Sequence, residues 1–72
     1  MTNITIIEEI YNSNLSRYYN NEYITPHDAM NIIRLYNNSS ETNKSKLISF
    51  SIPKLIRIAY HSFNISLAHN GF

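Results

Sequence analysis

The absence of cysteine from a chain of only 72 residues does most to limit how this protein can fold. A domain of this size buries only about 60% of its unfolded surface, and chains below roughly 70–80 residues often need disulfides, a metal or a partner subunit. Without cysteine, disulfides and cysteine-based zinc sites are excluded. Stability must therefore come from large apolar side chains, here twelve isoleucines, six tyrosines and three phenylalanines, or from association with another chain.

The first third of the chain has apolar residues at spacings of three and four, which predict an amphipathic helix. Thr5 or Asn3 is the expected cap. The stretch "NNEY", which begins at Asn20, is expected to end the helix because Asn tolerates the left-handed conformation that stops helices. The apolar positions of this helix are Ile6, Ile7, Ile10, Tyr11, Leu15, Tyr18 and Tyr19.

The stretch "TPHDAMNIIRLYNNSS" carries the clearest local signal and predicts a second helix over residues 26–37. Thr25 is placed as the N-cap, Pro26 as the first helical residue, and Asp28 as the acid of a capping box. "NNSS" breaks the helix. The stripe expected to be buried is formed by Ala29, Ile32, Ile33 and Tyr36, with Met30 beside it.

The remaining residues predict two helices, over 43–50 and 52–68, with a corner at Ser51–Pro53. Thr42 or Glu41 is expected near the cap of the first, and Ser51 can cap the second. Proline fits an early helical position but not an interior one, although a single long helix kinked at Pro53 is the alternative. No strand-like alternation is evident. The predicted fold class is all-α, a compact bundle of about four short helices in a single domain, residues 1–72.

Several classes of protein are excluded or disfavoured by missing features. The start of the chain lacks the basic and apolar stretches of a signal peptide, and no run approaches the roughly 18 apolar residues of a membrane span, so we expect a cytoplasmic protein. Gly71 is the only glycine, which excludes phosphate-cradling loops and nucleophile elbows. His27, His61 and His69 lack the spacing of metal ligands. We therefore expect no enzyme activity, no cofactor, no metal and no small-molecule substrate.

Charge is distributed unevenly along the chain. Residues 1–41 hold all five acids against two arginines, a net charge of −3, whereas residues 42–72 hold three lysines and one arginine without an acid, a net charge of +4. Such asymmetry indicates an anionic partner for the C-terminal half, and a solvated basic surface is the alternative. The high content of Ile, Asn and Tyr is typical of AT-rich coding DNA, as in phage, plasmid or low-GC bacterial genes.

Residues 26–63 resemble the trihelical helix-turn-helix domains of resolvases and homeodomain-like regulators. The segments "DAMNIIRLYNN", "NKSKLISF" and "IPKLIRIAYHSF" have about the lengths and order of a supporting helix, a short helix and a recognition helix. The resemblance implies that Ile48, Phe50, Leu55 and Ile58 fill the core between the last two helices. It also implies that Ser45 is the small residue facing the neighbouring helix.

A helical wheel of the last helix separates an apolar face from a basic face. Lys54, Arg57 and His61, followed by Asn64, lie at spacings of three and four on the basic face, and such side chains can reach phosphates and base edges. The resemblance implies that the first three face the DNA groove, with Lys44 and Lys46 on phosphates. The apolar face is formed by Ile52, Leu55, Ile56, Ala59 and Phe63.

Four further apolar residues lie off this face and predict an interface: Ile58, Tyr60, Ile65 and Leu67. Either the first helix or another chain is expected to cover them, because a monomer should not expose so much apolar surface. A DNA-binding protein typically makes about 6–10 phosphate contacts, whereas one copy offers four basic residues in its C-terminal half. If the protein binds double-stranded DNA, we therefore expect a homodimer, since a dimer doubles the positive electrostatic field and presents two recognition helices.

Other functions fit the same sequence. A phage- or plasmid-type inhibitor or modulator, acting on a protein partner without nucleic acid, is favoured by the surplus of Ile and Tyr and by the low content of Lys and Arg. A basic amphipathic helix over 52–68 at an anionic membrane surface is a third possibility, for which the cations are few.

Overall fold

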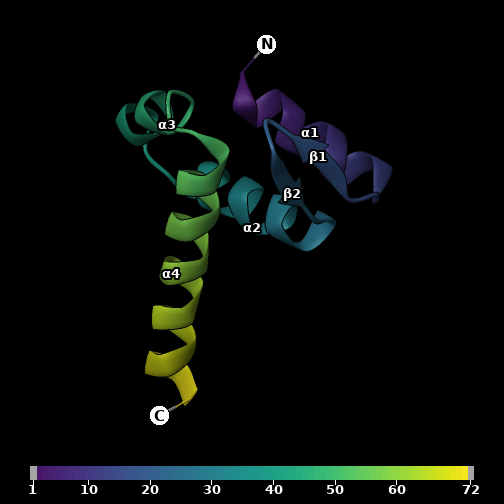
Figure 1. Ribbon diagram of the computed structural model, residues 1–72. Helices are drawn as coiled ribbons and strands as arrows, with labels where there is room; N and C mark the ends of the chain where they lie inside the picture. The colour runs from purple at the N-terminus through teal and green to yellow at the C-terminus, as the bar shows by residue number, and fades with distance from the viewer. Residues whose placement is uncertain (1, 72) are drawn as a thin grey trace.

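The chain folds as four α-helices and one small β-hairpin (Figure 1). The computed structural model describes the backbone of residues 2–71 and the side chains of residues 2–62. The helices are α1 (Asn3–Ser13), α2 (Pro26–Asn37), α3 (Glu41–Leu47) and α4 (Ile52–Gly71), and the strands are β1 (Arg17–Tyr19) and β2 (Glu22–Ile24). The predicted mostly helical architecture is confirmed, whereas the prediction that strands are absent is wrong.

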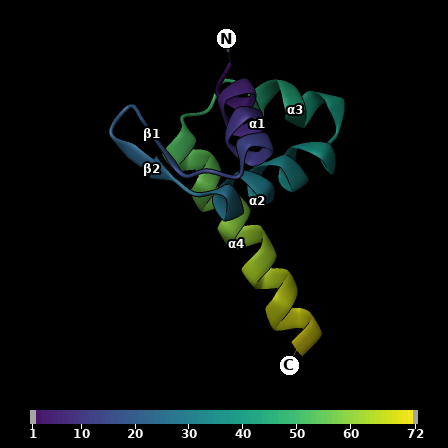
Figure 2. The ribbon, with the colours of Figure 1, turned by 90° about the vertical axis from the view of Figure 1, so that its right-hand side faces the viewer.

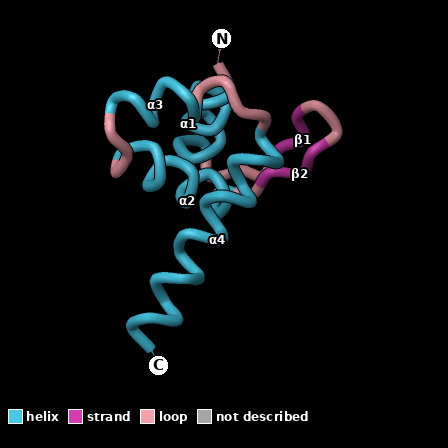
Figure 3. The backbone as a smooth tube through the Cα atoms, turned by 90° about the vertical axis from the view of Figure 1, so that its left-hand side faces the viewer, coloured by secondary structure: helices cyan, strands magenta, loops and turns pink. Residues whose placement is uncertain are grey.

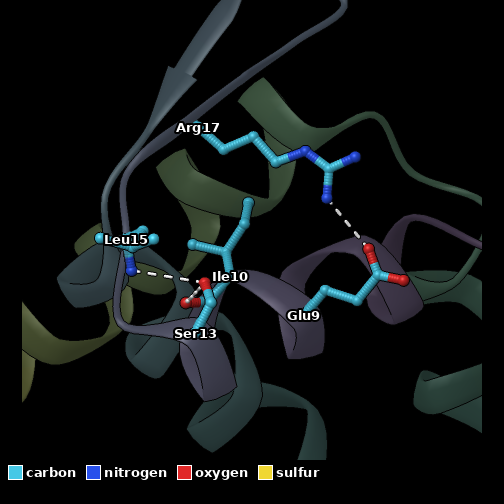
Figure 4. Close-up of polar contacts among 5 residues, drawn as sticks. All are labelled: Glu9, Ile10, Ser13, Leu15 and Arg17. Atoms are coloured by element: carbon cyan, nitrogen blue, oxygen red, sulfur yellow. Dashed lines mark hydrogen bonds and ion pairs between the residues drawn. The ribbon is translucent and has the colours of Figure 1, made fainter.

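Helix α1 is shorter than its apolar periodicity predicts. It ends at Ser13, and Asn14 adopts the left-handed conformation with φ 56° and donates its N–H to the carbonyls of Ile10 and Tyr11. The chain then turns away, with the Ser13 hydroxyl bonded to the carbonyl of Ile10 and to the N–H of Leu15 (Figure 4). The cap is Thr2, whose hydroxyl accepts from the N–H of Thr5, and not Thr5 or Asn3 as expected.

A β-hairpin replaces the predicted end of the first helix. Its strands are antiparallel, with Tyr18 opposite Tyr23, and Asn20 and Asn21 form the two-residue turn with φ values of 50° and 65°. Two successive residues with positive φ make a type I′ turn, whose twist matches that of the strands. The tolerance of Asn for this conformation was the basis for expecting a helix stop, but two in a row form a hairpin instead. Ile24 anchors the hairpin because it is fully buried.

Helix α2 matches its prediction at both ends. The Thr25 hydroxyl accepts from the N–H of Asp28, and the Asp28 carboxylate accepts from the N–H of Thr25, which completes the capping box. Ala29 and Ile32 are fully buried, as expected. The partly buried members of the predicted stripe are Met30, Ile33 and Tyr36.

Two separate helices follow, so the alternative of one kinked helix is wrong. Helix α3 begins two residues earlier than expected because Ser40, and not Thr42 or Glu41, is its N-cap. It ends at Leu47, which leaves residues 48–51 as the corner. The side-chain amide of Asn3 donates to the carbonyl of Phe50 at 2.8 Å and so ties this corner to the start of α1.

The core lies where α1, α2, the hairpin and the first half of α4 meet. Helix α2 packs against both α1 and α4, and the second half of α4 extends away from the body (Figures 1 and 2). Within residues 2–71, no helix combines the length and the apolar content needed to cross a membrane. The largest fully buried side chains are Ile7, Ile10, Ile24, Ile32 and Leu55.

Candidate nucleic-acid interface

Helix α4 begins with a cap and a proline that orient its two faces. The Ser51 hydroxyl accepts from the N–H of Lys54, and Pro53 occupies an early position where a missing N–H costs nothing. The predicted apolar face packs inward, with Ile52, Leu55 and Ala59 buried and Ile56 partly buried against the core. Phe63, the last member of that face, lies outside the described side chains.

The opposite face of α4 presents a basic stripe, which we define as Lys54, Arg57 and His61. All three side chains are exposed, and spacings of three and four place them along one side of the helix. No residue with a described side chain forms an ion pair with any of the three. Because α4 itself contains no acid, the charges of Lys54 and Arg57 have no counter-charge on their own helix.

Lys54, the first residue of the basic stripe, contacts the corner between α3 and α4. The Lys54 ammonium lies 4.0 Å from the centre of the Phe50 ring, within the range of a cation–π contact. Phe50 is itself held by the bond between its carbonyl and Asn3. The start of α4 therefore carries a cation whose position depends on the α3–α4 corner.

The two lysines of α3 have different surroundings. The Lys44 ammonium lies 3.5 Å from the Glu41 carboxylate and 5.4 Å from the centre of the Tyr36 ring, and its side chain is only 27% exposed. Lys46 is exposed and has no ion-pair partner among the described residues. Both were expected on phosphates, but Glu41 offsets the charge of Lys44, so Lys46 is the lysine of α3 that adds to the positive surface.

Ile58 faces α2 and α3, where it is partly buried. It shares a shallow hollow of about 240 Å³ with residues that include Leu35, Lys46 and Phe50. A wider, open hollow of about 470 Å³ lies on its other side and is bounded by Arg57, His61 and Ser62. The basic stripe therefore borders a concave, partly apolar surface.

Of the other predicted interface residues, Tyr60 has a described side chain, whereas the remaining two do not. Tyr60 is 64% exposed at the point where α4 leaves the body. Ile65 and Leu67 lie beyond residue 62, outside the described side chains. In Figure 3 the backbone of this second half of α4 lies away from α1, which belongs to the core.

The core positions implied by the resemblance are met only in part. Leu55 is fully buried, and Phe50 and Ile58 are partly buried. Ile48 is 39% exposed and does not fill the core, because α3 ends before it. Ser45 does not face a neighbouring helix: it is exposed, and its hydroxyl donates to the carbonyl of Glu41 one turn earlier.

The hairpin next to α4 was missed by the sequence analysis. Tyr19 and Asn20 share a hollow of about 240 Å³ with Ser51, Ile52 and Pro53, so the turn of the hairpin lies beside the start of α4. Tyr18 and Tyr23 form a ring pair with centres 5.0 Å apart, and both are more than half exposed. Adjacent asparagines between tyrosine- and isoleucine-containing segments were the available signal for this hairpin.

One ion pair in the N-terminal half joins two elements of the fold. A nitrogen of the Arg17 guanidinium lies 3.0 Å from the Glu9 carboxylate, which joins the hairpin to α1 (Figure 4). Among the described side chains, no three His, Cys, Asp or Glu residues gather as metal ligands would.

No protein-family model, curated protein or solved structure matches the chain. The candidate site therefore stands on its own geometry.

Proposed function

We propose that this protein is a small non-enzymatic regulator that acts in the cytoplasm and binds double-stranded DNA as a homodimer. The observation that carries the proposal is the basic stripe, in which two exposed cations and a histidine lie on the outward face of a helix whose inward face is buried. Helix α3, the four-residue corner and α4 would form the helix-turn-helix, with α2 as the supporting helix. Lys54, Arg57 and His61 would face the groove, where they can reach phosphates and base edges, while Lys46 would contact a phosphate beside it.

The charge of the surface explains why the proposal includes a dimer. Lys46, Lys54 and Arg57 supply three contacts in one copy, and Lys44 is offset by Glu41. Typical DNA-binding proteins make about 6–10 phosphate contacts. Two copies reach that range. Tyr60, which is exposed beside the projecting half of α4, supports that half as the dimer element, together with Ile65 and Leu67 in the sequence.

Binding to a mixed pool of duplex DNA at low and moderate salt tests the proposal. The wild-type dimer should lose about a thousandfold in affinity between 50 and 200 mM salt. The variant Lys54→Glu/Arg57→Glu should bind at least about a hundredfold more weakly at low salt, because two phosphate contacts become repulsions.

The matched control is Arg17→Glu/Arg34→Glu, which changes the net charge by the same amount in the other half of the chain. Circular dichroism checks that each variant keeps its helix content. The control should bind within about tenfold of wild type, since both arginines lie outside α3 and α4. Absence of binding at low salt, or equal losses in both variants, would reject a DNA site on α4.

A second candidate function is favoured by a different surface. Four exposed apolar side chains come from residues 11–23, namely Tyr11, Leu15, Tyr18 and Tyr23. Tyrosine is enriched among residues that dominate protein interfaces. A phage- or plasmid-type inhibitor that binds a protein partner would use this surface. Replacing Tyr18 and Tyr23 with serine would then abolish capture of the partner while DNA retention, if any, stays unchanged.

A further inference from the structure

The outward face of α4 is bordered on two sides by other elements. On one side, Ile58 of α4 shares a hollow with Lys46 of α3. On the other side, Asn20 of the hairpin turn shares a hollow with Ser51 and Pro53 at the start of α4. All three views place the first turns of α4 between α3 and the hairpin (Figures 1, 2 and 3).

The tip of the hairpin carries groups suited to a phosphate. Asn20 and Asn21 are both exposed, and each brings a side-chain amide as a hydrogen-bond donor. Asparagine side chains and backbone N–H groups are common donors to DNA phosphates. The hairpin has one acid, Glu22, which is partly buried and pairs in register with Tyr19, itself packed against the core. The turn itself is therefore uncharged.

The tip is also held in place before any ligand arrives. Ile24 is fully buried at one end of the hairpin, and Arg17 at the same register position pairs with Glu9 of α1. The type I′ turn fixes the two asparagines in the left-handed conformation. A contact made by a preformed turn costs little conformational entropy, which favours binding.

We infer that the hairpin tip, Asn20 and Asn21, is a second DNA contact, which donates hydrogen bonds to the sugar–phosphate backbone beside the groove that α4 enters. The inference rests on the proposed function and adds a part of the surface that lies 30 residues or more before the basic stripe in the sequence. The inference gives α4 and the hairpin different roles in binding. Cations on α4 supply most of the attraction, and neutral amides on the hairpin fix the position of the duplex.

Two variants test this contact, with the mixed duplex pool as the probe. Asn20→Asp/Asn21→Asp keeps the turn, because Asp also tolerates the left-handed conformation, but places two carboxylates where phosphates would lie. Affinity should fall about tenfold or more. Asn20→Gly/Asn21→Gly keeps the backbone and removes only the amides, and affinity should fall about threefold.

The matched control is Asn12→Asp/Asn14→Asp at the end of α1, which Figure 1 shows on the far side of the body from α4. Asn14 is also exposed and left-handed, so the chemistry and the backbone conformation match those of the turn. This control should bind within about twofold of wild type. Thermal unfolding checks that all three variants remain folded.

The outcomes separate this inference from the proposed function. If the wild-type protein does not bind DNA, or if Lys54→Glu/Arg57→Glu binds as well as wild type, the proposed function fails. If the wild type binds and both hairpin variants match it, only the hairpin contact is rejected. A loss with the Asp variant but none with the Gly variant would also overturn it, because charge repulsion alone would then explain the effect.

Discussion

Arg17 and Arg57 are exposed arginines in opposite halves of the chain, and their surroundings differ. Arg17 reaches a carboxylate at 3.0 Å and ties the hairpin to α1. Arg57 has no carboxylate on its own helix and no ion-pair partner among the described residues. The same side chain therefore contributes to the fold in one half and stays available for an anion in the other. The difference shows that the position of a cation relative to the acids, more than the net charge of +1, indicates where a partner would bind.

The comparison between the two arginines assumes that both halves of the chain fold as one unit. Core substitutions test this assumption, and they have the largest expected effect on the free energy of unfolding. Leu55 of α4 and Ile7 of α1 are both fully buried and belong to one core. Leu55→Ala and Ile7→Ala should each lower the free energy of unfolding by about 2–5 kcal/mol, because each leaves a cavity. Urea unfolding followed by circular dichroism should show a single transition for both.

The control for the core substitutions is Thr42→Ala, which changes an exposed residue of α3 and should cost less than about 0.5 kcal/mol. Two separate transitions, or a loss in Leu55→Ala below about 1 kcal/mol, would contradict a shared core. The outward position of Arg57 could then not be attributed to the packing of α4 in a core shared with α1 and α2.

A second prediction sharpens the comparison by removing each arginine in turn. Arg57→Gln should weaken DNA binding about tenfold and reduce the slope of log affinity against log salt by about 1, since one phosphate contact is lost. Arg17→Gln should leave the slope unchanged and lower the affinity by no more than about threefold, because Glu9 already occupies that guanidinium and Arg17 acts only by holding the hairpin. The measurement is a salt titration of binding to the mixed duplex pool. Equal changes of slope in the two variants would show that neither arginine is distinguished by its position.

Local signals predicted the parts of the fold that depend on neighbouring residues. The Thr25–Pro26–Asp28 cap and the bounds of α2 were predicted and are confirmed, because a capping box acts within one turn. The buried face of α4 around Leu55 and Ala59 was also predicted, since a wheel needs only the helical period. The same periodicity placed Lys54 and Arg57 on the outward face.

The parts that were missed depend on contacts between distant residues. Tyr18 and Tyr19 fit a helical spacing as well as a strand, and the burial of Ile24 in a core built by other helices favours the strand. The bond from Asn3 to the corner spans 47 residues. For the candidate site, the contact of Lys44 with Tyr36 depends on how α3 packs on α2. Ile48 was assigned to the core by the resemblance, but α3 ends at Leu47 and not at the expected residue 50.

The smallest expected effect concerns the energy of the Arg17–Glu9 pair itself. Both side chains are about half exposed, so water and salt screen the pair. A double-mutant cycle with Arg17→Gln and Glu9→Gln should give a coupling of about 0.2–1 kcal/mol in the free energy of unfolding, and less at high salt. Arg57→Gln, measured in the same way, should change the free energy of unfolding by less than about 0.5 kcal/mol. If Arg57→Gln destabilised the fold as much as Arg17→Gln does, Arg57 would be a structural cation like Arg17, and the basic stripe would lose its central member as a candidate for binding an anion.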